Sequence, residues 1–172
     1  TVDPFKNYTI NTKALFDISD KISLSTSGRF FNQEQDYIAS SELSGKSTID
    51  EWNISLKANH IANNKWKNSI ELYKTNYYTE EYLNTADGSS YSDSFYDHNL
   101  IHSEIKSIYK PKDNRTYVFG LGYNNETLER TYFTIKPEFK SPYAYVQYDF
   151  NPKENLNIIV GGRYDNHNKY KS

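Results

Sequence analysis

Apolar and polar residues alternate along most of this chain, and helical spacing is hard to find. The clearest case is residues 51–60, EWNISLKANH, where Trp52, Ile54, Leu56 and Ala58 fall on one face while charged and amide residues fall on the other. A period of two residues with one apolar face is typical of a β-strand that lies against an apolar medium on one side and water on the other. The pattern therefore predicts an all-β fold.

About eight segments show this alternation, and many of them reach ten residues or more. They are residues 6–17, 21–30, 51–60, 65–78, 98–110, 116–126, 143–150 and the start of 155–170. Strands in soluble sheets average about five to six residues, whereas tilted strands that cross a bilayer need about 9–11. The length of the segments favours membrane-spanning strands, so the expected fold class is an antiparallel transmembrane β-barrel segment.

The connections between these segments alternate in length. Short turns rich in Asn, Asp, Lys or Pro are expected at 17–21 (DISDK), 62–65 (ANNK), 111–114 (PKDN) and 151–155 (NPKEN). Long, polar, Tyr-rich loops are expected at 32–48, 79–97 and 124–141. Short turns at one end and long loops at the other are the arrangement of bacterial outer-membrane barrels, in which the short turns face the periplasm.

The order of the connections predicts where the chain ends lie. Because the first and the last connection are both short, the first strand runs toward the periplasm and the last strand runs away from it. Both chain ends are then extracellular, whereas a self-contained barrel normally begins and ends on the periplasmic side. We therefore expect an internal part of a larger barrel, whose two edge strands require neighbours.

Composition narrows the choice of partners and compartments. The 172 residues carry a formal net charge of −2 with both signs interspersed, which leaves no basic patch for nucleic acid. No run approaches the roughly 20 apolar residues of a spanning helix. The sequence contains no Cys, which excludes disulfides, zinc–thiolate sites and thiol catalysis. Its 17 Tyr and 9 Phe suit positions that are apolar at one end and wet at the other, such as a membrane interface.

No catalytic or cofactor motif stands out. The sequence has no GxSxG, HExxH or phosphate loop, so we predict neither enzymatic activity nor a cofactor. His98 and His102 would lie about 13 Å apart along a strand, too far to share a metal ion, and are expected to be ordinary polar positions. Residues 87–97, DGSSYSDSFYD, lack the spacing of a calcium loop and are expected to be a solvated outer loop.

Two groups of residues are candidates for substrate binding. Arg163 and Asp165 lie two apart and are expected on the lumen-facing side, either as a charged network of the wall or, for Arg163, in contact with ligand. Aromatic residues gather in and beside the second long loop, where they either form a membrane girdle or line a substrate vestibule. They are Tyr77, Tyr78, Tyr82, Tyr91, Phe95 and Tyr96.

Residues 141–170, SPYAYVQYDFNPKENLNIIVGGRYDNHNKY, carry a more specific signal. One strand, a short turn and a second strand that ends in GGRYDNH resemble the barrel of TonB-dependent outer-membrane receptors. The resemblance implies a barrel of about 22 strands filled by an N-terminal plug domain. It also implies uptake of a scarce nutrient, such as an iron–siderophore, haem, cobalamin or a glycan, with energy from the inner-membrane TonB complex.

For this chain the resemblance implies that residues 1–172 are part of one receptor barrel domain in a Gram-negative outer membrane, without the plug. The expected partners are outer-membrane lipid, the remainder of the barrel and its plug, the TonB complex through the plug, the extracellular nutrient and a surface lipoprotein. Two alternatives remain open at this point. One is a passive porin-like channel, and the other is a soluble, carbohydrate-binding β-sandwich, which predicts short strands.

Overall fold

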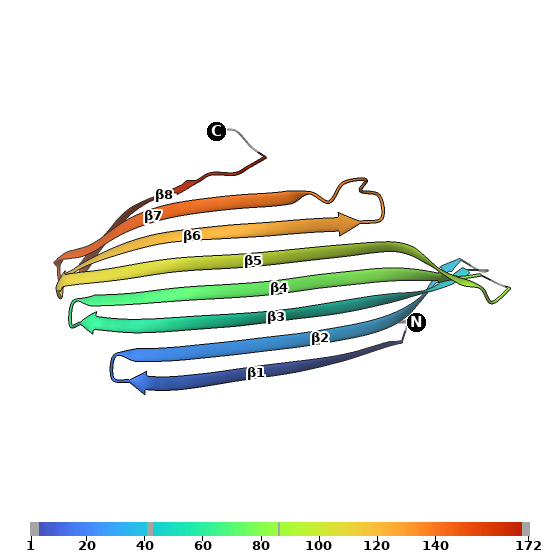
Figure 1. The fold of residues 1–172 in the computed structure, drawn as a ribbon, viewed down its shortest axis with the longest axis horizontal. Coiled ribbons are helices and arrows are strands. Elements are labelled where there is room, and N and C mark those ends of the chain that lie inside the picture. Colours follow the sequence, from blue (N-terminus) through green and yellow to red (C-terminus); the bar gives the residue numbers. More distant parts are fainter. Residues whose placement is uncertain (1–3, 41–42, 86, 170–172) are drawn as a thin grey trace.

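The computed structural model describes residues 4–40, 43–85 and 87–169. These residues form one antiparallel sheet of eight strands that lie side by side in chain order (Figure 1). The strands are β1 (Phe5–Ser19), β2 (Ile22–Ser40), β3 (Leu43–Asn63), β4 (Trp66–Asn84), β5 (Ser90–Lys112), β6 (Arg115–Arg130), β7 (Glu138–Lys153) and β8 (Leu156–Asp165). The all-β fold class and the eight long strands are thus confirmed.

The sheet is open. Each strand pairs only with its neighbours in the chain, and β1 and β8 do not pair with each other within the described residues. In the same part of the chain no helix is long and apolar enough to cross a membrane. The strands have 10 to 23 residues, about two to four times the mean for soluble sheets.

The four short turns are tighter than the sequence predicts. Only two residues, such as Asn64 and Lys65 between β3 and β4, separate the paired strands at this end. The Asn63 side chain accepts hydrogen bonds from the backbone N–H groups of Lys65 and Trp66, at 2.8 and 3.1 Å. An Asn side chain that caps its own turn in this way explains the Asn and Asp content of these turns. We call this end of the sheet the turn end.

The three long loops of the sequence prediction are mostly strand, so that prediction was wrong in extent. β2 and β3 fill 32–48 up to the two residues 41–42, which lie outside the described residues. The connection between β4 and β5 is only residues 85–89, and that between β6 and β7 is 131–137. Backbone hydrogen bonds continue here although both sheet faces are polar, and without an apolar face the alternation that marks a strand disappears. We call this end the loop end.

The short connection between β4 and β5 has its own hydrogen bonds. The Asp87 carboxylate accepts bonds from the backbone N–H and hydroxyl of Ser89 and from the Thr85 hydroxyl. These bonds lower the pKa of Asp87 to about 2. Gly88 takes a positive φ of 83°, a backbone conformation that favours glycine. A polar segment that sequence analysis treats as a loop therefore closes a defined hairpin.

The two faces of the sheet differ in chemistry, as the strand register shows. The apolar face exposes large side chains from every strand, among them Ile10, Phe16, Ile54, Leu56, Ile70, Leu72, Ile105, Phe119, Leu121, Val146 and Val160. The polar face carries cross-strand ion pairs, including Arg29–Glu51 at 3.1 Å and Lys57–Glu71 at 3.0 Å. Tyr143 is the buried hydrophobic residue of the described part of the chain, with 6% of its surface exposed. A single layer therefore leaves its apolar face without a core to cover it.

An aromatic ladder marks the turn end of the apolar face. Trp66 stacks on Tyr109 at a centroid distance of 4.4 Å, Tyr117 on Tyr148 at 4.6 Å, and Tyr148 lies 4.9 Å from Phe150. Tyr109 and Tyr117 join the two groups at 6.2 Å, so the ladder runs from β4 to β7. At the other boundary of the apolar face, the Lys74 ammonium lies 5.5 Å from the Trp52 ring. The apolar surface thus has an aromatic border at both ends.

Candidate functional site

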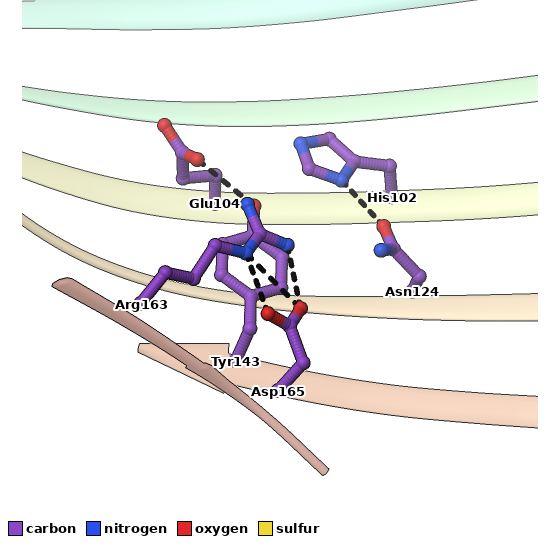
Figure 2. Close-up of polar contacts among 6 residues, drawn as sticks. All are labelled: His102, Glu104, Asn124, Tyr143, Arg163 and Asp165. Atoms are coloured by element: carbon purple, nitrogen blue, oxygen red, sulfur yellow. Dashed lines mark hydrogen bonds and ion pairs between the residues drawn. The ribbon is translucent and has the colours of Figure 1, made fainter. Parts of the chain in front are cut away.

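The most connected group on the polar face is centred on Tyr143 (Figure 2). Its register partner on β6 is Gly122, which in turn pairs with Glu104 of β5. Because Gly122 has no side chain, the Tyr143 ring lies flat across β6, and a Cβ on Gly122 would overlap that ring. The Tyr143 hydroxyl donates a hydrogen bond of 2.8 Å to Glu104 Oε2. One tyrosine therefore bridges three strands.

The same arrangement is repeated one row toward the turn end. Tyr145 faces Gly120 in the register, and its ring occupies the space where a Cβ on Gly120 would lie. The Tyr145 hydroxyl donates to Glu104 Oε1 at 3.2 Å. The carboxylate of Glu104 therefore accepts one tyrosine hydroxyl on each oxygen, which satisfies a half-buried charge with two hydrogen bonds.

Arg163 and Asp165 complete the cluster from β8. They lie on the polar face, as their spacing of two residues predicts, and form a bidentate pair with Nη2–Oδ1 at 2.7 Å and Nε–Oδ2 at 2.8 Å. The guanidinium carbon lies 3.8 Å from the centroid of the Tyr143 ring (Figure 2). Cation–π contact and ion pairing therefore orient Arg163 together. Arg163 thus belongs to a charged network on the polar face, and its contact with a ligand stays a prediction.

A groove lies beside this cluster on the same face. It has a volume of about 480 Å³, and its lining includes Glu104, Tyr145, Gln147, Gly161 and Arg163. The two charged side chains give the groove one acceptor and one donor of fixed orientation. It is therefore a surface on which a polar partner or ligand can bind.

The two strand histidines each have a local partner. His102 and Asn124 form a hydrogen bond (Figure 2), with Nδ1 and Oδ1 2.7 Å apart, and His98 Nε2 lies 3.5 Å from Glu126 Oε2. Both lie on the polar face, four residues apart on β5. Nowhere in the described ranges do three His, Asp or Glu side chains come close enough together to hold a metal ion.

The candidate tyrosines of the sequence prediction divide between the two faces. Tyr77, Tyr91 and Tyr96 lie on the polar face, and the rings of Tyr77 and Tyr96 meet edge to face at 6.0 Å. Tyr78 and Tyr82 point to the opposite side. The structure thus brings the Tyr77 and Tyr96 rings together on the polar face, and it brings the Tyr78 and Tyr82 hydroxyls to the same Glu80 carboxylate on the opposite face.

Tyr78 illustrates the environment beyond the apolar border. Its ring stacks on Phe95 with centroids 6.5 Å apart, and its hydroxyl donates to Glu80 at 2.7 Å. Burial first, and this hydrogen bond second, raise the pKa of Tyr78 to about 12. Tyr78 therefore stabilises the extended hairpin of β4 and β5 on the side opposite the polar face.

Sequence reasoning did not identify Glu104, Tyr143 and Tyr145 as a unit. The signal was present as two short patterns, Gly120-Leu-Gly122 and Tyr143-Ala-Tyr145. Each is unremarkable alone, because its meaning depends on the register that places the tyrosines opposite the glycines. Arg130, at the end of β6, was missed as well, and it lines a separate cavity near the loop end.

No protein-family model matches this chain, and no curated protein matches it in sequence. Among solved structures, its fold is similar to that of the ferric citrate transporter FecA in the unliganded form, an outer-membrane barrel, with a TM-score of 0.64 and 11% sequence identity. The match covers 92% of this chain and 27% of the transporter chain. At this identity the similarity concerns the fold alone, an open antiparallel sheet of long strands.

Proposed function

We propose that this chain is part of the wall of an outer-membrane transporter that takes up a metal chelate or another large nutrient, of the siderophore, haem or cobalamin class. The observation that carries the proposal is the single sheet with one apolar and one polar face. A protein in water would have to cover the apolar face, whereas lipid covers it without a second layer. The polar face then lines the lumen of the barrel.

The dimensions of the apolar face support this proposal. Trp52 pairs with Asn76, and Asn76 is ten residues from Trp66 on β4 (76 − 66). At about 3.3 Å per residue this is roughly 33 Å along the strand. A tilt of about 40° reduces it to about 25 Å along the membrane normal, the height of the apolar band in outer-membrane barrels. The spacing of the two tryptophans therefore matches the distance between the two interfaces of a bilayer, which supports the proposal.

One of the two alternatives disagrees with the fold. A soluble β-sandwich has two packed sheets around a core, whereas the described residues form one sheet with long strands. The choice between an active receptor and a passive channel rests on the resemblance of residues 141–170 to TonB-dependent receptors. We propose the active mode, without enzymatic activity, in a Gram-negative outer membrane. The proposed partners are the rest of the barrel, a plug, the TonB complex, the nutrient and a surface lipoprotein.

Fluorescence quenching in lipid vesicles tests the membrane assignment. Variants Trp52→Phe and Trp66→Phe each leave one tryptophan, and each is refolded into vesicles whose lipids carry bromine near the head group or near the bilayer centre. Because both residues lie at the border of the apolar face, head-group bromine should quench both more strongly than central bromine. A folded protein that remains in water, with neither tryptophan quenched, would contradict the proposal.

A test of active against passive transport requires the complete receptor in cells. Uptake of its nutrient should stop when the TonB complex is deleted, because a plugged barrel opens only with that energy. Uptake of a small sugar through a porin in the same cells serves as the control. Nutrient uptake that continues unchanged without TonB would favour the passive channel.

A further inference from the structure

A cavity of about 410 Å³ lies on the polar face near the loop end, apart from the Tyr143 cluster. Two cross-strand rows form its floor. Thr79, Tyr96 and Arg130 pair in one row, and Glu81 pairs with Ser94 in the next. Thr131 and Tyr132, the first two residues of the connection between β6 and β7, close one side of the cavity. Its volume lies within the range of small-molecule sites, about 300–1,000 Å³.

Hydrogen bonds hold the walls of this cavity in place. The Thr131 hydroxyl accepts a bond of 2.7 Å from the backbone N–H of Phe95, and the Thr131 N–H donates to the Phe95 carbonyl at 3.2 Å. The Tyr96 ring is fixed by Tyr77, which meets it at an interplanar angle of 72°. A Tyr96 ring held by Tyr77 and a Thr131 held by two hydrogen bonds reduce the entropy that is lost when a ligand binds.

The charges of the cavity have both signs. The Arg130 guanidinium carbon lies 5.8 Å from the ring centroid of Tyr132 and 5.4 Å from that of Phe133. Within the described residues it forms no ion pair, so its N–H groups are available as donors. Glu81 and Asp93 also line the cavity, and Glu81 accepts a hydrogen bond of 3.3 Å from Ser94. The cavity therefore offers fixed donors and acceptors side by side.

This combination selects a chemical class of ligand. The carboxylates of Glu81 and Asp93 repel an anion that would bind to Arg130. Arg130 in turn repels a cation that would bind to the carboxylates. A hydroxyl can accept from a guanidinium and donate to a carboxylate, so a neutral polyol satisfies both. We propose that this cavity binds a neutral oligosaccharide, whose hydroxyls contact Arg130 and Glu81 while the face of one sugar ring packs on Tyr96. The proposal rests on the proposed function in placing the cavity at the outer, ligand-capturing end of the wall.

Calorimetric titration of the folded full chain in detergent micelles tests this inference. The probes are maltotriose, cellotriose and chitotriose, with citrate as the anionic and spermidine as the cationic comparison. We expect saturable binding of at least one trisaccharide. Tyr96→Ala and Arg130→Gln should each weaken it by about tenfold or more, because each removes a principal contact. Tyr73→Ala, on the same face but outside the cavity, should change it by less than about twofold.

Three results would overturn the inference: no trisaccharide binds, citrate or spermidine binds more tightly than every trisaccharide, or the Tyr96 and Arg130 variants bind as the parent does. Circular dichroism of each variant verifies that the sheet is intact. The tryptophan quenching experiment keeps the two proposals apart. If the protein binds a trisaccharide but its tryptophan fluorescence is not quenched by brominated lipid, the ligand site is supported and the membrane proposal is refuted. If the fluorescence is quenched but no trisaccharide binds, the membrane proposal is supported and the ligand site is refuted.

Discussion

Gly122 is the residue on which the Tyr143 cluster depends most directly. A Cβ at this position would overlap the Tyr143 ring, so Gly122→Ala should displace the ring from Glu104 and from the Arg163 guanidinium. Forcing an extra methyl group into a packed contact costs about 1–3 kcal/mol. We expect the free energy of unfolding to fall by that amount, as measured by urea unfolding in micelles with circular dichroism.

Gly162 provides the matched control on β8. A Cβ there would meet nothing within 4 Å, so Gly162→Ala should change the free energy of unfolding by no more than about 0.5–1 kcal/mol, with either sign. The double variant Gly122→Ala with Tyr143→Ser should recover part of the loss, since it removes the overlapping ring. Equal stability of the two Gly→Ala variants would show that Tyr143 does not depend on the space above Gly122.

At the scale of elements, the strands extend beyond the apolar face into segments that the sequence pattern predicts to be loops. Hydrogen exchange distinguishes paired strand from loop in these segments. Residues 31–38 and 79–83 are paired strand in the structure, although their polarity suggests loops. Their paired amides should exchange with solvent roughly a hundredfold more slowly than those of an unstructured chain, because exchange requires the hairpins to open. Hydrogen exchange followed by mass spectrometry measures this rate.

The exposed connection 131–137 is the internal comparison for that experiment, because it contains few backbone hydrogen bonds. Fast exchange in 131–137 together with slow exchange in 31–38 and 79–83 is the expected pattern. Should all three segments exchange at the same rate, the outer parts of β2 and β4 would be loops in solution, as the sequence analysis predicts.

At the scale of the whole molecule, the sheet has a direction relative to the membrane. The sequence contains no Cys, so a single cysteine reports its own location. In intact cells a membrane-impermeant maleimide should label Thr134→Cys, in the connection at the loop end, and should leave Asn64→Cys, at the turn end, unlabelled until the cells are lysed. Labelling of Asn64→Cys alone in intact cells would reverse the orientation.

Part of this architecture was predictable from local patterns. The alternation in residues 51–60 requires one face of β3 to be apolar. Turn sequences such as ANNK end one strand and reverse the chain direction before the next. The number and order of the strands and the positions of the short turns therefore follow from the sequence. The loop predictions at 32–48 and 79–97 were wrong because alternation reveals a strand only where its two faces meet different media. Polar strands such as the outer part of β4 contain no such contrast.

The candidate site was predictable only where its residues are neighbours in the sequence. Arg163 and Asp165 are two apart, so any extended conformation places them on one face, where they pair. The contacts of Glu104 with Tyr143 and Tyr145 join residues about forty positions apart in the chain, and they depend on the register between β5, β6 and β7. A shift by one residue would turn these side chains to the apolar face.

The sequence by itself determined the two-faced character of the strands, because side-chain direction alternates with each residue of an extended chain. It also determined the turn positions, since Asn, Asp and Pro act locally on the backbone. Tertiary structure alone decided that Tyr143 spans Gly122, that the outer hairpins continue as strands, and that Arg130, Tyr96 and Glu81 enclose one cavity. The physical reason is that each of these features requires a particular cross-strand register, which pairing of the whole sheet selects.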